Sequence, residues 1–144
     1  ITISVWANLN VSDTSGAEAV SLGDYVAIRL DSARNKGAMG FYYDGTTWHA
    51  TTTGTFYVGA GWHHVVYVID ASNKSQNVYI DGVVMGSTTH TQSLSYVGLG
   101  SNTFIGKHGN GVSTYDFNGL IDDVSVYNRA LSNQEVLDLF NNSN

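Results

Sequence analysis

Residues 117–140 constrain the fold most, because their side-chain pattern changes from the period of a strand to the period of a helix. Side chains alternate between two faces in a strand, so residues 120–127 are expected to have a face made of Leu120, Asp122, Val124 and Val126. After Ser132 the apolar residues are spaced as on one side of a helix: Val136, Leu139 and Phe140. We therefore predict a strand followed by a helix of about two to three turns.

The start of this helix has its own signature. Ser132 is followed three residues later by Glu135, which is the spacing of a capping box. In that motif the hydroxyl accepts from a free backbone N–H, while the carboxylate reaches back to the N–H of the capping residue. Leu131 and Val136 are placed for a hydrophobic staple. Glu135 is thus assigned a structural role rather than a catalytic one.

The rest of the chain consists of short β-branched or alternating runs separated by turn residues. The expected strands are residues 1–9, 24–30, 40–43, 46–51, 62–70, 77–80, 83–86 and 103–107. Asp44-Gly45 and Asp81-Gly82 each lie between two runs and predict two-residue type I′ hairpins. Residues 10–23 and 108–115 are interpreted as a polar loop and an exposed loop. About ten strands and one helix predict an all-β sandwich.

Composition narrows the function classes. A chain of 144 residues is expected to form one domain, and its lack of cysteine excludes disulfides and thiolate metal sites. The net charge is −6 and the six basic residues are scattered, which argues against a nucleic-acid partner. No apolar run approaches the ~20 residues of a membrane span. The chain begins within a strand-like pattern and without methionine, so we interpret it as a piece of a larger protein.

Three segments carry a family resemblance: residues 2–6 (TISVW), residues 62–82 (from WHHVV to VYIDG) and residues 117–132. In this order they resemble the laminin G-like, or concanavalin A-like, jelly-roll domains of secreted and cell-surface proteins, especially bacterial ones. The resemblance covers nearly the whole chain. It implies an antiparallel two-sheet jelly-roll sandwich with one short C-terminal helix, in a single domain over residues 1–144. It also implies carbohydrate binding or adhesion, often with a structural calcium ion, outside the cell.

The chain departs from the family pattern at its beginning. Such domains usually have another strand before the segment equivalent to residues 2–6, and that strand lies beside the last one. Its absence would leave a sheet edge open. We expect that the segment was cut off or that another chain fills the gap.

Asp122 is the first candidate calcium ligand. It shares its expected face with Val124 and Val126, and a buried carboxylate must be paired, hydrogen-bonded or bound to a metal. Calcium takes about 6–8 oxygen ligands, and Asp123 and Asp116 are the further candidates. The alternative is that Asp122 accepts from backbone N–H groups or pairs with Arg129.

Catalysis is not expected. Glycoside hydrolysis needs two carboxylates at about 5–9.5 Å, and the only two glutamates are Glu18, assigned to a loop, and Glu135, in the capping box. Asp122 and Asp123 are adjacent and are expected to face opposite ways. The same argument excludes a two-histidine metal site at residues 63–64, where His64 is given a structural role. The chain is therefore predicted not to be an enzyme.

Sugar binding commonly uses exposed aromatic rings. Trp48 lies near a hairpin tip with Tyr43 across the turn, and Tyr115 lies in a polar loop, so these three are the predicted carbohydrate-binding residues. Trp6 and Trp62 are expected in the core. Burial of both Trp48 and Tyr115 would remove this site.

The sequence thus favours a non-catalytic, extracellular carbohydrate-binding or adhesion module with a glycan or cell-surface ligand. The alternative is a structural protein–protein interaction module whose edge strand is completed by a partner chain. A degenerate glycosidase-like domain is the third reading.

Overall fold

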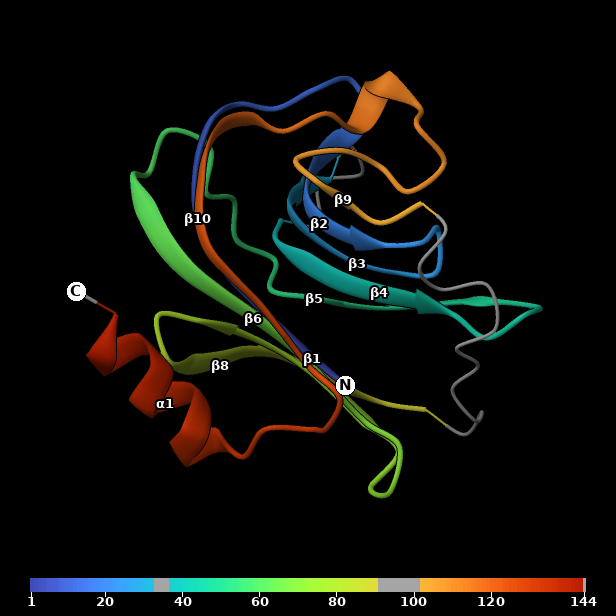
Figure 1. The fold of residues 1–144 in the computed structure, drawn as a ribbon, viewed down its shortest axis with the longest axis vertical. Helices are drawn as coiled ribbons and strands as arrows, with labels where there is room; N and C mark the ends of the chain where they lie inside the picture. The colour runs from blue at the N-terminus through green and yellow to red at the C-terminus, as the bar shows by residue number, and fades with distance from the viewer. Residues whose placement is uncertain (33–36, 91–101, 144) are drawn as a thin grey trace.

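The computed structural model describes residues 1–32, 37–90 and 102–143 and contains two antiparallel sheets of five strands each, together with one helix (Figure 1). The first sheet has the order β10-β1-β6-β7-β8, formed by β10 (Asn118–Tyr127), β1 (Thr2–Val11), β6 (Trp62–Asp70), β7 (Ser75–Ile80) and β8 (Val83–Thr89). The second has the order β5-β4-β3-β2-β9, formed by β5 (Trp48–Thr52), β4 (Met39–Tyr43), β3 (Val26–Ser32), β2 (Gly16–Leu22) and β9 (Phe104–Ile105). The predicted all-β jelly-roll sandwich is confirmed.

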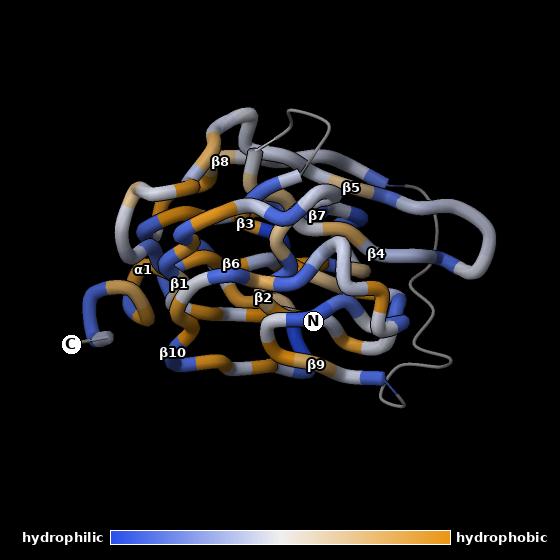
Figure 2. Tube along the Cα trace, turned by 90° about the horizontal axis from the view of Figure 1, so that it is seen from above, coloured by the Kyte–Doolittle hydropathy of each residue, from blue (hydrophilic) through white to orange (hydrophobic). Residues whose placement is uncertain are grey.

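The core lies between the two sheets, where alternate residues of facing strands meet. Figure 2 shows the hydrophobic residues, in orange, concentrated in the strands of both sheets. The largest fully buried side chains of this core are Tyr42, Tyr67, Ile3, Leu9, Ile28, Leu30 and Ile69. Trp62 does not join them: it is 43% exposed, so its predicted place in the core is wrong.

The helix α1 (Asn133–Asn142) covers part of the outer face of the first sheet. Both hydrogen bonds of the predicted capping box are present: the Ser132 hydroxyl accepts from the backbone N–H of Glu135, and the Glu135 carboxylate accepts from the backbone N–H of Ser132. Val136 packs with Leu131 on the outer side of β6 and β7, in a second apolar cluster. Leu139 packs against this cluster, and Phe140 stacks on Trp6, so the apolar side of the helix is fixed to the sheet.

One of the two predicted tight hairpins is confirmed. Asp81 and Gly82 have φ values of 51° and 79° and join Ile80 directly to Val83, as a two-residue turn with two positive φ angles requires. The other connection is longer, because Tyr43 pairs with Trp48 and four residues lie between them. An aspartate side chain at position 44 that accepts from turn amides favours this wider loop.

Residues 10–23 were predicted to be a loop, but they contain β2, whose seven residues are all buried. Both faces are covered because β2 lies in the sandwich on one side and under the segment after β9 on the other. The register of β2 against β3 also shifts on either side of Glu18. A buried strand with bulges lacks the simple alternation by which a strand is recognised in a sequence.

A bulge also overturns the expected faces of β10. Ser4 is opposite Ser125 and Trp6 is opposite Asp122, so one residue of β1 faces two residues of β10. Asp123 has a φ of 48°. As a result Asp122 and Asp123 are both exposed, whereas Ile121 and Val124 pack against the core. Asp122 is therefore not the inward-facing carboxylate that the alternation predicted.

Candidate functional site

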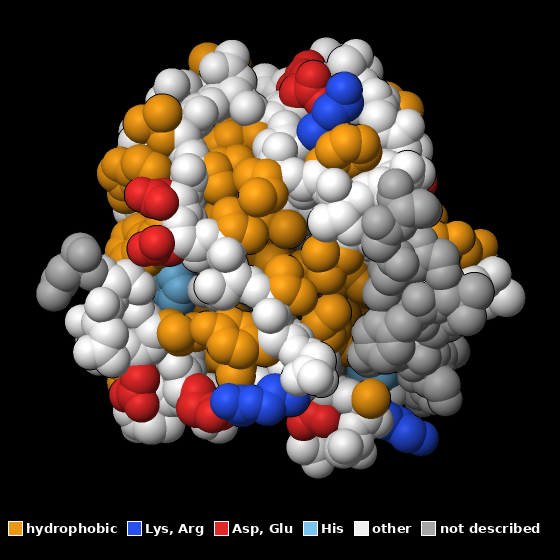
Figure 3. Space-filling view, in the orientation of Figure 1, with side chains coloured by type: hydrophobic (Ala, Val, Ile, Leu, Met, Phe, Trp, Pro, Cys, Tyr) orange, Lys and Arg blue, Asp and Glu red, His pale blue; other side chains and the backbone are white. Residues whose placement is uncertain are grey.

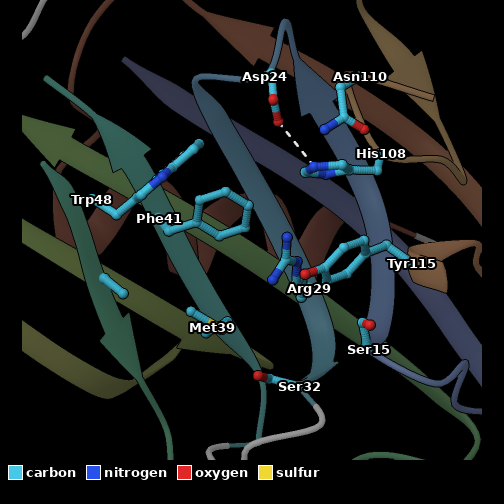
Figure 4. Close-up of a pocket in the computed structure, with 11 residues that line it drawn as sticks. Ser15, Asp24, Arg29, Ser32, Met39, Phe41, Trp48, His108, Asn110 and Tyr115 are labelled. Carbon is cyan, nitrogen blue, oxygen red and sulfur yellow. Dashed lines mark ion pairs between the residues drawn. The ribbon is translucent and has the colours of Figure 1, made fainter. Parts of the chain in front are cut away.

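A cleft of about 660 Å³ lies on the outer face of the second sheet (Figure 4). Successive side chains of β3, β4 and β5 alternate between the core and the outer face of the sheet. Arg29, Phe41 and Trp48 are among those that face outward. The segment after β9 closes the opposite side. The cleft is lined by Ser15, Asp24, Arg29, Ser32, Met39, Phe41, Trp48, Ala50, His108, Asn110 and Tyr115.

The first wall of the cleft is aromatic. The Trp48 ring packs edge-on against Phe41, with 5.3 Å between ring centroids, and lies 4.9 Å from the ring of Tyr43. Trp48 is nevertheless 48% exposed. A large aromatic ring that is held by two others and still faces solvent is a suitable surface for a flat apolar ligand face.

The hairpin tip beside this wall is held by Asp44. Its Oδ1 accepts from the backbone N–H groups of Thr46 and Thr47, and its Oδ2 lies 2.7 Å from Nε2 of His49. The hydrogen bond to His49 and those to the turn hold the pKa of Asp44 well below its usual range. The carboxylate therefore remains charged at neutral pH and keeps the turn closed.

The second wall is Tyr115, which lies in a short 3₁₀ turn (Ser113–Tyr115). The guanidinium carbon of Arg29 lies 4.0 Å from the centre of the Tyr115 ring and 4.3 Å from the centre of the Phe41 ring. Arg29 is thus stacked between an aromatic residue from each wall, as Figure 4 shows. Stacking fixes the plane of the guanidinium and leaves its edge for hydrogen bonding.

Charged groups lie beneath and beside Arg29. Its Nε donates to Oε2 of Glu18 over 2.8 Å, and Nδ1 of His108 lies 2.9 Å from the same oxygen. On the other side of the His108 ring, Nε2 lies 2.9 Å from Oδ1 of Asp24. Oδ1 of Asp24 is buried and makes no hydrogen bond to the described residues beyond this ion-pair contact. Glu18 is fully buried, whereas the side chain of Asp24 is 34% exposed.

The segment that carries His108 is packed tightly onto the sheet. A Cβ at Gly109 would lie only 1.9 Å from the carbonyl oxygen of Gly23, in the turn between β2 and β3. Only glycine permits this approach. His108 is therefore buried, so the predicted exposed loop over residues 108–115 is wrong at its start, whereas residues 110–113 are exposed as predicted.

The comparison with protein families supports this architecture. A family model described as the concanavalin A-like lectin/glucanases superfamily matches residues 1–137. The chain belongs to this superfamily. No curated protein matches it.

Solved structures of similar fold include two domains of enzymes that were solved with a saccharide bound. Domain 4 of AbnA, a GH43 extracellular arabinanase from Geobacillus stearothermophilus solved with arabinotriose, is 22% identical with a TM-score of 0.73. That match covers 96% of this chain and 65% of the other, so the chain spans less than two thirds of that domain. The CBM40 of the Ruminococcus gnavus IT-sialidase, bound to α2,3-sialyllactose, is 16% identical with a TM-score of 0.75, over 96% of this chain and 81% of the other. These identities establish the likeness of fold.

Two of the three predicted sugar-binding residues, Trp48 and Tyr115, line the cleft of this concanavalin A-like domain. Neither is buried, so the condition that would have removed the site is not met. Tyr43 lies behind Trp48 and supports its ring. The polar groups of the cleft were not predicted from the sequence, although the position of Arg29 between the apolar residues Ile28 and Leu30 was a signal for them.

The three predicted calcium residues fall in two places. Asp122 and Asp123 line a shallow depression with Trp6 and Trp62, whereas Asp116 lines another with Asp13. Arg129, the alternative partner of Asp122, instead binds Glu135 over 2.7 Å. Within residues 1–32, 37–90 and 102–143, no three His, Cys, Asp or Glu side chains come together as a metal site. A calcium ion stays a prediction.

The described part of the chain also contains no helix that is long and apolar enough to cross a membrane.

Proposed function

We propose that this domain is a non-catalytic carbohydrate-binding module and that its ligand lies in the cleft between Trp48 and Tyr115. The observation that carries the proposal is an exposed tryptophan opposite a tyrosine, with Arg29 between them and with Asp24 and Asn110 at one end of the cleft. Sugar rings have apolar faces that stack on aromatic rings and hydroxyl groups that need both donors and acceptors. The cleft offers each of these on rigid strands or on a tightly packed segment.

The carboxylates of the cleft favour binding over hydrolysis. A glycosidase needs two carboxylates that reach the scissile bond. Glu18 is fully buried and accepts from both Arg29 and His108, so its oxygens are already used. Asp24 alone of the two is open to a ligand. This argues against the degenerate-glycosidase reading.

An extracellular or cell-surface location is part of this proposal. Its support is the family's common setting and the structural likeness to a domain of an extracellular arabinanase. The glycan would then belong to a cell surface or an extracellular polysaccharide.

The three tryptophans provide a direct test. The indole N–H groups of Trp6, Trp48 and Trp62 give three resonances in an NMR spectrum of the ¹⁵N-labelled protein, and only Trp48 lines the cleft. Titration with arabinotriose and other oligosaccharides is expected to shift the Trp48 resonance. Trp48→Ala should weaken binding by about 1–3 kcal/mol, the range for an aromatic anchor at an interface. Trp62→Ala, which removes a similarly exposed ring elsewhere, is the matched control.

Absence of binding to any oligosaccharide of a broad glycan array would refute the proposal. Binding that shifts Trp6 and Trp62 while leaving Trp48 unchanged would place the ligand on the first sheet instead.

A protein–protein role is the second candidate, and the edge of β10 supports it. Among the described strands β10 pairs with β1 alone, so its other edge has no strand beside it. Leu120 and Val126 of this strand are 57% and 50% exposed, and Ile105 of β9, at the edge of the second sheet, is 61% exposed. Figure 3 shows hydrophobic side chains along the opening between the sheets on this side of the molecule. An extended strand from another chain would cover them.

Sedimentation measurements test this candidate with a second copy of the chain as the partner strand. Self-association that disappears in Val126→Lys would support it, because a charge on an edge strand opposes pairing. A monomer at high concentration would count against pairing between copies.

For calcium, we propose Asp116 and its surroundings rather than Asp122. Oδ1 of Asp116 and Oγ of Ser12 are buried without a hydrogen-bond partner in the described structure, and Asp13 lines the same depression. Backbone carbonyls and water would have to complete the about 6–8 oxygens that calcium takes. A chelator should lower the melting temperature of the wild type and not of Asp116→Asn. Equal melting curves with and without chelator would refute this site.

A further inference from the structure

We propose that the buried carboxylate of Glu18 makes the cleft selective for neutral saccharides over acidic ones. Glu18 touches no ligand in this arrangement and acts through Arg29, so it is a positioning residue. The inference rests on the proposed saccharide binding in the cleft and concerns which class of saccharide is bound.

The position of Glu18 is unusual for a glutamate. It lies on β2 with no exposed surface, in a part of the sheet where charged side chains require a partner. Its Oε2 accepts from Nε of Arg29, and both of its oxygens lie within 3.0 Å of Nδ1 of His108. The negative charge is therefore fixed directly below the guanidinium that faces the cleft.

Arg29 is left with a free hydrogen-bonding edge and little free charge. Its side chain is 12% exposed and makes no hydrogen bond through Nη1 or Nη2 to the described residues. The rings of Phe41 and Tyr115 hold its plane from both sides. The guanidinium can thus donate to the hydroxyl oxygens of a sugar, as a directed donor whose charge is already balanced by Glu18.

The charges around the cleft also disfavour an acidic ligand. Among the described residues that line the cleft, Arg29 is the one permanent cation and Asp24 the one carboxylate, and the carboxylate of Glu18 is buried beneath Arg29. Even if His108 is protonated, the two positive charges only balance the two negative charges of the carboxylates, so the summed charge does not exceed zero. A ligand carboxylate would meet two fixed carboxylates and a protein of net charge −6. Neutral hydroxyls meet no such cost, since they donate to Asp24 and accept from Arg29.

The experiment compares an acidic and a neutral ligand with the same sugar backbone: trigalacturonic acid, and its methyl ester, which has a methyl group on each carboxylate in place of the charge. We expect the wild-type domain to bind the neutral ester about tenfold or more tightly than the acid, as measured by calorimetry at low salt. Glu18→Gln keeps the size of the side chain and one acceptor while removing the charge. It should shift the ratio of the two affinities by about tenfold toward the acid.

Two further variants make the result decisive. Asp24→Asn removes the second negative charge without touching Arg29, and it should shift the ratio in the same direction even if Glu18→Gln fails to fold. Asp138→Asn, on the exposed face of α1, is the control and should leave the ratio unchanged.

The possible outcomes distinguish the selectivity proposed for Glu18 from the saccharide binding proposed for the cleft. Tighter wild-type binding of the acid, or an unchanged ratio in folded Glu18→Gln, overturns the role of Glu18 and leaves saccharide binding intact. Failure of both probes and of a broad neutral panel to bind overturns the saccharide function itself.

Discussion

Nδ1 of His108 lies 2.9 Å from Oε2 of Glu18 and so joins two residues that are 90 positions apart in the sequence. Through this contact the segment after β9 is fixed to the outer face of β2, and Tyr115 is brought to the cleft. The same carboxylate binds Arg29 of β3. One buried group therefore holds together the floor and one wall of the candidate site.

Glu18→Ala should lower the free energy of unfolding by about 3 kcal/mol, because it leaves the partly buried charge of Arg29 and the ring of His108 without their acceptor. Urea unfolding at neutral pH measures this loss. Asp138→Ala removes a carboxylate that binds only an exposed glutamine of α1 and should change stability by less than about 0.5 kcal/mol. Equal losses in the two variants would show that the buried network contributes no stability.

Gly109→Ala should displace the segment that carries His108, because its Cβ would lie 1.9 Å from the carbonyl oxygen of Gly23. We expect a loss of about 2 kcal/mol in urea unfolding, typical of overpacking, together with weaker saccharide binding. Gly111→Ala is the matched control in the same segment. Its φ of 82° costs about 1 kcal/mol for a side chain, but no atom lies within 4 Å of the added Cβ. A similar loss of binding in both variants would contradict the argument from close packing.

The sequence predicted the features that depend on local patterns. The capping box of Ser132 and the turn at residues 81–82 follow from neighbouring residues alone, and both are confirmed. It failed where a bulge changes the alternation, at Glu18 and at Asp122–Asp123. An inserted residue reverses every later side chain, and no local pattern reports its position.

The candidate site was predictable in its aromatic part and not in its polar part. An exposed position for Trp48 follows from its place beside a hairpin turn. The contact of Glu18 with His108 depends on how a distant segment folds over β2. Such a contact has no signal in a single sequence.

Thr2→Val should cost about 2 kcal/mol, although it replaces one β-branched residue by another of the same shape. The buried hydroxyl of Thr2 donates to the carbonyl oxygen of Arg129 and accepts from the N–H of Leu131, so it ties β1 to the segment before α1. Valine would leave that N–H buried without a partner. Thr88→Val, on the exposed part of β8, is the control and should change urea unfolding by less than about 0.5 kcal/mol. A neutral effect of Thr2→Val would mean that water replaces both hydrogen bonds.

Acid should destabilise the domain in part through His64. Burial between Trp6 and Phe140 lowers the pKa of His64 below its ordinary value of 6.5, and the carboxylates of Asp81 and Asp123 only partly oppose this. Above pH 6.5 both the folded and the unfolded chain hold a neutral ring, so the group does not change the free energy of unfolding. Below pH 6.5 the unfolded chain takes up a proton first, and stability falls until the pH passes the lower pKa of the folded state.

Urea unfolding of the wild type and of His64→Gln between pH 8 and pH 5 measures how much of the acid-induced loss of stability is due to His64. Glutamine can still bind Ser4, which lies 2.8 Å from Nε2 of His64, but it does not titrate. We expect a smaller loss of stability on acidification in this variant than in the wild type. His63→Gln changes the neighbouring half-buried histidine and should leave the part of the acid-induced loss of stability that is due to His64 unchanged. Equal slopes for wild type and His64→Gln would show that His64 is protonated equally in the folded and unfolded states, and therefore that its burial carries no cost to the charged ring.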